Sequence, residues 1–165
     1  MDFAALAQTC APAVHPLTMA AIVHVESGFN PYAIGVVGGR LVRQPRNLAE
    51  AVATAQSLEK AGYNFSVGVA QVNRYQLAGH GLDYARAFDA CESLRAGAEI
   101  LEECFGRARV RYPIEQHALQ ASFSCYYSGS FTRGFAREGD VQGSYVGRVL
   151  ASAQRLGNWT ANGKP

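Results

Sequence analysis

Glu26 has the clearest capacity for chemistry in this sequence. It follows the apolar run at residues 20–23 and stands two positions before Gly28, which places it in the last turn of a buried helix. Desolvation and the negative end of the helix dipole both favour a protonated carboxyl group there. A protonated glutamate can act as a general acid near neutral pH. The alternative interpretation is an ordinary glutamate that faces solvent at a helix end.

A second candidate is the segment Gly68-Val69-Ala70-Gln71, which follows Ser66 closely. Glycine in such a loop lets backbone amides approach a ligand, and Gln71 offers a donor and an acceptor to a sugar amide or hydroxyl. Without a ligand, the segment is simply a hairpin-like turn.

Tyrosines form the third candidate group. Tyr126 and Tyr127 end a predicted helix, and Tyr145 opens the last one. Their hydroxyls could hydrogen-bond a catalytic carboxyl group, and their rings suit the apolar faces of sugars. Packing at the rim of a core is the alternative for all three.

The four cysteines are Cys10, Cys91, Cys104 and Cys125. They contain no CxxC pair and no zinc-finger spacing with histidine, so we expect no structural metal. They are either reduced core residues or two disulfides formed in an oxidising compartment, and spacing alone allows three connectivities. We favour disulfides, paired Cys10–Cys91 and Cys104–Cys125. The second pair would link two successive helices that are joined by a short turn.

The elements that position these residues are predicted to be helices, in an all-α or nearly all-α single domain. A glycine- and proline-rich loop is expected at residues 30–45, and a loop or short extended structure at 63–73 leads into a helix near Tyr75. Asn47 caps one helix, Ser93 is the expected cap of another, and Pro113 separates two more. The predicted helices are 2–10, 16–28, 48–61, 93–108, 114–127 and 141–156. The domain would span residues 1–156, followed by a polar tail at 157–165.

Composition excludes several classes of function. A chain of 165 residues with 48% hydrophobic residues can bury one core, and its net charge of +2 gives no basic face for nucleic acid. No run approaches the roughly 20 apolar residues of a membrane-spanning helix, so none is expected. The first residues lack the basic and apolar regions of a signal peptide, so export is not encoded here in the usual way.

Together, the three candidate segments resemble motifs of the soluble lytic transglycosylases, in the same order. Residues 26–31 resemble that family's Glu-Ser motif, 68–73 its Gly-Leu-Met-Gln-Ile motif, and 126–129 its Ala-Tyr-Asn-Ala-Gly motif. Residues 145–150 resemble its final Tyr-Val segment. The chain is still more similar to the lytic transglycosylase subunit of type IV secretion systems, in residues 6–12, in 88–91 and in the helical insert between the first two motifs. It departs from the family at Ala70, where methionine is usual, and at Tyr127, where asparagine is commonest.

This resemblance implies a lysozyme-like fold and cleavage of peptidoglycan glycan strands in the periplasm, beside other subunits of a type IV secretion system. It implies that Glu26 is the acid/base and that Tyr145 contacts it, while Ser27, Gln71 and Tyr126 orient the substrate or the glutamate. No metal or other cofactor is implied. The residues expected to bind substrate are Ser27, Gly68, Ala70, Gln71, Tyr126 and Tyr145.

The number of carboxylates bears on the mechanism. Most glycosidases need two, but none of the three central motifs holds a second one, and Asp83, Asp89 and Asp140 are more simply solvated or capping residues. A transglycosylase needs one, because the sugar's own 6-hydroxyl is the nucleophile and a 1,6-anhydro ring results. The alternatives are a hydrolytic, goose-type-like lysozyme, a non-catalytic peptidoglycan-binding subunit, and a thiol enzyme that uses Cys125 with His117.

Overall fold

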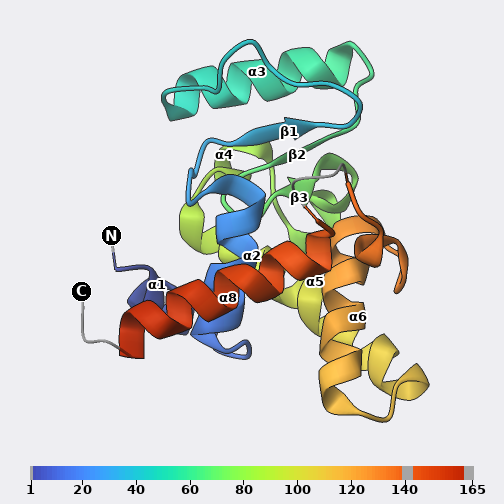
Figure 1. Cartoon of the computed structure of the whole chain (residues 1–165). Coiled ribbons are helices and arrows are strands. Elements are labelled where there is room, and N and C mark those ends of the chain that lie inside the picture. Colours follow the sequence, from blue (N-terminus) through green and yellow to red (C-terminus); the bar gives the residue numbers. More distant parts are fainter. Residues whose placement is uncertain (1, 139–142, 162–165) are drawn as a thin grey trace. The chain divides into compact units, whose positions relative to one another are not determined.

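The computed structural model describes residues 2–138 and 143–161, the last three as backbone only (Figure 1). Helices dominate these residues, which confirms the predicted mostly helical, lysozyme-like class. The α-helices are α1 (Phe3–Cys10), α2 (Pro16–Ser27), α3 (Leu48–Lys60), α4 (Tyr84–Ala87), α5 (Ala90–Arg111), α6 (Glu115–Ser128) and α8 (Tyr145–Ala161). The short 3₁₀ helices are η1 (Arg74–Gln76), η2 (Ala78–His80) and η3 (Arg133–Phe135), and the strands are β1 (Ile34–Val36), β2 (Phe65–Val67) and β3 (Val72–Asn73).

The chain forms two compact units. The first comprises Met1–Ala11 and Glu26–Gly97, and the second comprises Pro12–Val25 and Ala98–Pro165. One division follows α1, and the other two fall inside α2 and α5. No helix among the described residues combines the length and apolar character needed to cross a bilayer.

Side-chain caps explain why several predicted helix ends are correct. The carboxylate of Asp2 accepts a hydrogen bond from the amide of Ala4 at 3.1 Å at the start of α1. Asn47 Oδ1 accepts from the amide of Glu50 at 2.9 Å at the start of α3. Both side chains satisfy amides that the first turn of a helix leaves without a carbonyl. Beyond α3, Gly62 has φ +82°, a left-handed conformation that ends a helix at low cost in glycine.

The predicted boundaries of α5 and α8 are wrong. Helix α5 begins at Ala90 instead of residue 93, because the Asp89 carboxylate caps it by accepting from the amide of Glu92 at 2.9 Å. Helix α8 begins at Tyr145, where Ser144 Oγ accepts from the amide of Gly147 at 2.9 Å, and it runs to Ala161. Residues 157–161 of the predicted tail are therefore helical. Residues 141, 142 and 162–165 lie outside the described residues.

The three strands form an antiparallel sheet in the order β1-β2-β3, inside the first unit. The prediction of short extended structure within residues 63–73 is thus correct, whereas β1 lies in a segment predicted as loop. The register pairs Ile34 with Val67 and Val67 with Val72, and these three side chains are buried. One face of the sheet therefore belongs to the core of this unit.

The start of α3 carries an ionic contact that predicts pH-dependent stability. A hydrogen bond from the Arg43 guanidinium and a second from the amide of Arg46 lower the pKa of Glu50 to about 2. The stability that Glu50 contributes is fully present above its unfolded pKa and is lost as pH falls toward 2. Glu50→Gln should therefore melt at a lower temperature than the parent chain at pH 7, with the gap closing between pH 4.5 and 2. Thermal melting followed by circular dichroism measures this gap. Glu102→Gln, at an exposed carboxylate on α5, controls for the lost charge, and a gap independent of pH would contradict the prediction.

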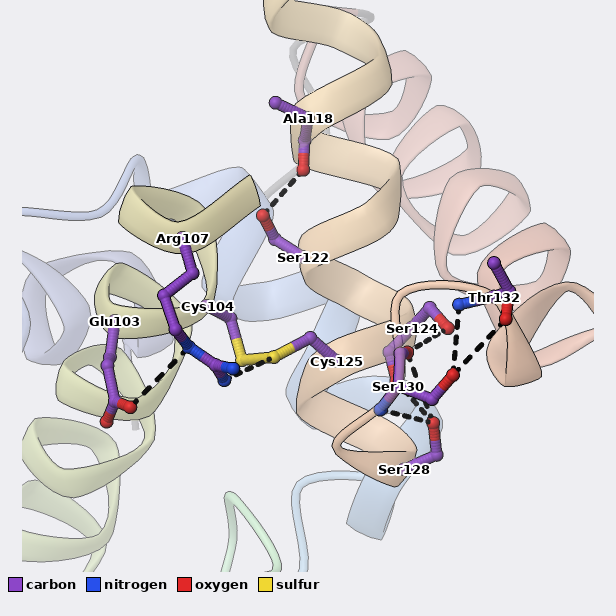
Figure 2. The surroundings of a disulfide bond; sticks show 10 residues. All are labelled: Glu103, Cys104, Arg107, Ala118, Ser122, Ser124, Cys125, Ser128, Ser130 and Thr132. Carbon is purple, nitrogen blue, oxygen red and sulfur yellow. Dashed lines mark hydrogen bonds and ion pairs between the residues drawn. A yellow bond between two sulfur atoms is a disulfide. The ribbon is translucent and has the colours of Figure 1, made fainter. Parts of the chain in front are cut away.

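Both favoured disulfides are present. Cys10 pairs with Cys91 within the first unit, and Cys104 pairs with Cys125 within the second. The second bond ties α5 to α6, as Figure 2 shows, and the Arg107 guanidinium donates to Cys125 Sγ at 3.2 Å. The cysteines are therefore cross-links and not free thiols.

The two disulfides should stabilise the protein unequally. They span sequence separations of 81 and 21 residues, and a longer closed loop removes more entropy from the unfolded chain. Replacing both cysteines with alanine should cost about 4.5 kcal/mol for the Cys10–Cys91 pair and about 3.3 kcal/mol for the Cys104–Cys125 pair. Urea unfolding of the two double variants without reductant measures both costs. The reverse order would contradict the loop-entropy explanation.

Candidate active site

Glu26 and Ser27 are the last two residues of α2, as predicted, and both are half-buried. The buried interior of this helix, formed by Met19, Ala21, Ile22 and Val23, holds it in place. The Ser27 hydroxyl donates a short hydrogen bond of 2.6 Å to the carbonyl of Val69. This bond fixes the glutamate-bearing end of α2 on the segment 68–71.

Segment 68–71 is a tight turn that joins β2 to β3. The amide of Gln71 donates to the carbonyl of Gly68 at 3.1 Å and closes the turn. Gly68 and Gln71 both have positive φ, +83° and +51°. A left-handed conformation is uncommon for a residue other than glycine, so contacts of its side chain must hold Gln71 in place.

The Gln71 side chain supplies those contacts. Its Nε2 donates to the carbonyls of Ala33 and Gly68, both at 2.9 Å. Its Oε1 lies only 2.7 Å from the position that a Cβ on Gly35 would occupy. The amide nitrogen of the Gln71 side chain therefore forms its hydrogen bonds inside the fold. The side-chain oxygen lies beside Gly35 of β1, on the side toward which a Cβ at that position would point.

Two amides of the turn also bond within the protein. The amide of Gly68 donates to the carbonyl of Ala33 at 2.9 Å, and the amide of Ala70 donates to Ser93 Oγ at 3.1 Å. These two amides are therefore satisfied inside the fold, as in the alternative of a turn without a ligand. Ala70 and Ser93 are fully buried. Ser93, predicted as a helix cap, is instead the acceptor that anchors the turn on α5.

Both the positive φ and the lack of room for a Cβ require glycine at position 68. A Cβ at this position would lie 2.3 Å from the carbonyl oxygen of Ala87 and 2.8 Å from Ser93 Oγ. Such distances are far below van der Waals contact, and the first involves backbone that cannot rotate away. The turn can approach α4 and α5 this closely only with glycine.

Ring contacts hold the opposite face of the β2–β3 hairpin, which carries Phe65. Buried Phe65 stacks on Tyr84 with a centroid distance of 6.0 Å, and the Arg74 guanidinium lies 5.7 Å from the centre of the Phe65 ring. Burial and a hydrogen bond with the Glu59 carboxylate raise the pKa of Tyr84 to about 12. Tyr84 therefore stays neutral at physiological pH.

The candidate tyrosines lie in the second unit. Tyr145 is buried, and Tyr127 stacks on it with ring centroids 4.5 Å apart and planes 12° apart. The Tyr127 hydroxyl donates to Glu138, whose carboxylate also accepts from Arg148 at 3.2 Å. Tyr126 is half-buried in the last turn of α6.

A network of serines fixes the end of α6 that carries these tyrosines (Figure 2). The Ser124 hydroxyl donates to the carbonyl of Ser130 at 2.6 Å and accepts from the amide of Gly134 at 2.7 Å. The Ser128 hydroxyl donates to the carbonyl of Ser124 at 2.9 Å. Gly129, with φ +76°, lets the chain turn back after the helix.

The predicted site residues thus form two groups. Glu26, Ser27 and the 68–71 turn lie in the first unit, where the hydrogen bond to the carbonyl of Val69 joins Ser27 to the turn. Tyr126 and Tyr145 belong to the second unit.

The structure bears on the thiol-enzyme alternative and on the roles of the aspartates. Cys125 is bonded to Cys104, which excludes a thiol enzyme based on Cys125 and His117. The carboxylates of Asp83 and Asp89 cap α4 and α5 by accepting from backbone amides, at 2.8 Å and 2.9 Å. Asp140 lies outside the described residues. Within residues 2–138 and 143–161, no group of three His, Cys, Asp or Glu side chains could hold a metal ion.

Sequence reasoning missed Gln44 as a supporting residue. Its Oε1 accepts from the amide of Ile34 at 2.8 Å and its Nε2 donates to the carbonyl of the same residue at 3.0 Å. The side chain thereby pairs with the edge of β1 as another strand would. No local pattern marks such a glutamine, because its partner is a backbone group ten positions away.

The chain belongs to the transglycosylase SLT domain family, whose model matches residues 3–132. It is 63% identical to the type IV secretion system protein virB1 of Brucella abortus over 154 residues, which are 93% of this chain and 64% of that protein. Protein virB1 of Agrobacterium fabrum is 34% identical over 157 residues, 94% of this chain and 60% of that protein. The chain thus spans a little under two thirds of the length of these curated relatives. No solved structure matches it.

Proposed function

We propose that the chain is a peptidoglycan lytic transglycosylase. It would cleave the β-1,4 bond between N-acetylmuramic acid and N-acetylglucosamine and form a 1,6-anhydro ring on the muramoyl sugar. The observation that carries this proposal is Glu26 at the end of a buried helix, fixed through Ser27 to the turn that bears Gln71. Membership of the transglycosylase SLT family supports the class of reaction.

In the proposed mechanism, protonated Glu26 donates its proton to the glycosidic oxygen as the bond from that oxygen to C1 of the muramoyl sugar breaks. The N-acetyl group of the same sugar stabilises the positive charge that develops at C1. The Glu26 carboxylate then removes the proton of the 6-hydroxyl, and O6 bonds to C1. Glu26 is protonated again at the end, no water is consumed, and no metal or cofactor is needed.

The single carboxylate in this mechanism agrees with the roles of the nearby aspartates. The carboxylates of Asp83 and Asp89 are engaged as helix caps, which supports a mechanism in which neither activates a water molecule. This favours a nucleophile that the substrate supplies over the second carboxylate that hydrolysis usually requires.

The remaining site residues have supporting roles in the proposal. Gln71 Oε1 would accept from the substrate, and Tyr126 would orient either the substrate or Glu26. Tyr145 would contact Glu26. Gly68 and Ala70 would act by shaping the turn, since their amides bond within the fold. Residues 1–156 would act as one catalytic domain, in keeping with a family match that extends through both units.

The biological role in this proposal comes from the names of the relatives. The protein would open the wall locally for assembly of a type IV secretion or conjugation apparatus. Its partners would be glycan strands and other subunits of that apparatus, and nucleic acid is not among them. The two disulfides suit the oxidising periplasm.

Mass spectrometry of the products released from purified peptidoglycan tests the reaction. Muropeptides that end in a 1,6-anhydro sugar, lighter by one water than reducing-end products, are expected. Reducing-end products would identify a lysozyme instead. If the protein released nothing but still sedimented with the wall, a binding subunit would replace the enzyme.

A further inference from the structure

The end of α5 and its link to α6, residues 107–114, expose two aliphatic side chains. Val110 is 90% exposed in the last turn of α5, and Ile114 is 58% exposed just before α6. We call this segment the α5–α6 tip. Transfer of such exposed apolar side chains out of water is favourable in free energy, so the tip is suited to contact with an apolar phase.

The same tip is basic. Arg107, Arg109 and Arg111 are exposed, and Arg107 forms an ion pair with Glu103 at 3.7 Å. Glu115 is the one acidic residue in positions 107–115, so the charges of Arg109 and Arg111 face one negative charge. Arg109 Nη1 donates to the carbonyl of Pro113 at 2.9 Å and closes the turn. The alternation of arginine with Val110 places the charges around the apolar side chains.

Packing between α5 and α6 holds the tip in place. Ala108, Ala118 and Ala121 form a buried cluster with Phe105, Tyr112 and Phe131 around it. Tyr112 meets Phe131 edge to face with ring centroids 6.0 Å apart. The Cys104–Cys125 disulfide links the same two helices one turn before Ala108 in α5 (Figure 2). Docking through the tip therefore costs little ordering of the backbone.

We propose that the α5–α6 tip docks this protein on an anionic lipid surface. Val110 and Ile114 would enter the interface. Arg109 and Arg111, on either side of Val110, would bind lipid phosphates. A protein partner fits less well, because a stable interface needs about 800 Å² from each side and this segment has only eight residues on a turn. The proposal does not depend on the reaction proposed above.

Vesicle co-sedimentation tests the proposal with the whole chain. Vesicles of phosphatidylglycerol and phosphatidylcholine should bind the protein at least about tenfold more tightly than phosphatidylcholine alone, and high salt should reduce the difference. The variant Val110→Asp with Arg111→Glu should lose at least about tenfold in affinity for the anionic vesicles, since each charge near the surface is worth about fivefold. Val42→Asp with Arg40→Glu is the matched control. Val42 is 108% exposed and Arg40 is exposed, and both lie outside the tip.

Tryptophan fluorescence gives a second measurement that does not depend on charge reversal. Ile114→Trp should shift its emission to shorter wavelength on anionic vesicles, whereas Val42→Trp should not. Equal losses in the tip variant and the control variant would overturn the proposal, because they would indicate attraction by overall charge. If the parent chain bound neither kind of vesicle, the lipid surface would be excluded and a protein partner would remain for the tip.

Discussion

Glu26→Gln should lower the release of soluble fragments from purified peptidoglycan by at least about a hundredfold. Glutamine is nearly isosteric with glutamate, but its amide can neither donate a proton to the leaving oxygen nor accept one from the 6-hydroxyl. Both steps of the proposed reaction use this one carboxyl group, so no other residue of the 68–71 turn can replace it. Initial rates of fragment release, measured by chromatography with mass detection, give the ratio.

The fold should be unaffected by that change, since Glu26 is half-buried at the end of α2 and the Ser27 bond to Val69 remains. An unchanged melting temperature and unchanged sedimentation with the wall would establish this. Glu115→Gln, at an exposed carboxylate on α6, is the matched control and should retain full activity. Activity retained in Glu26→Gln would remove this residue from the mechanism.

Gly68→Ala should destabilise the protein by about 2 to 5 kcal/mol and abolish activity along with it. The left-handed backbone costs a residue with a Cβ about 1 to 2 kcal/mol, and overpacking adds about 1 to 3 kcal/mol. The new methyl group would lie 2.3 Å from the carbonyl oxygen of Ala87, so the turn has to move off α4 and α5. That movement breaks the bond from Ala70 to Ser93 and displaces Gln71. Urea unfolding measures the loss of stability.

Gly62→Ala separates the two causes. Gly62 has nearly the same backbone conformation, φ +82°, but a Cβ there would meet nothing within 4 Å. It should therefore cost only the conformational term, about 1 to 2 kcal/mol, and leave activity intact. Equal losses in Gly62→Ala and Gly68→Ala would show that the close approach to Ala87 does not matter.

Local signals were enough to predict much of the fold. Asp2, Asn47 and Gly62 act within three residues of the helix ends that they define, so their effect is visible in the sequence alone. The apolar run in α2 has the same property, and it placed Glu26 correctly in the last turn. The disulfide between α5 and α6 followed from two helices joined by a short turn.

Tertiary contacts account for what could not be predicted. Ser93 has the chemistry of a cap, but its partner is the amide of Ala70, 23 positions earlier, and Asp89 caps α5 in its place. The sequence predicts that the last helix ends before Gly157, yet α8 continues through it with Gly157 beside Leu17. The inward bonding of the amides of Gly68 and Ala70 was also hidden, because glycine content indicates a close approach without saying what approaches.

The two disulfides also bear on the order in which the chain matures. Cys104 and Cys125 are only 21 positions apart, so their thiols meet as soon as α5 and α6 form a hairpin. Cys10 and Cys91 are 81 positions apart, so their thiols meet only after the much longer chain between them has condensed. The species with one bond that accumulates during oxidative maturation should therefore be closed at Cys104–Cys125, with the segment that carries Tyr126 already organised. The first unit, which carries Glu26, would then be the last to be cross-linked by its disulfide.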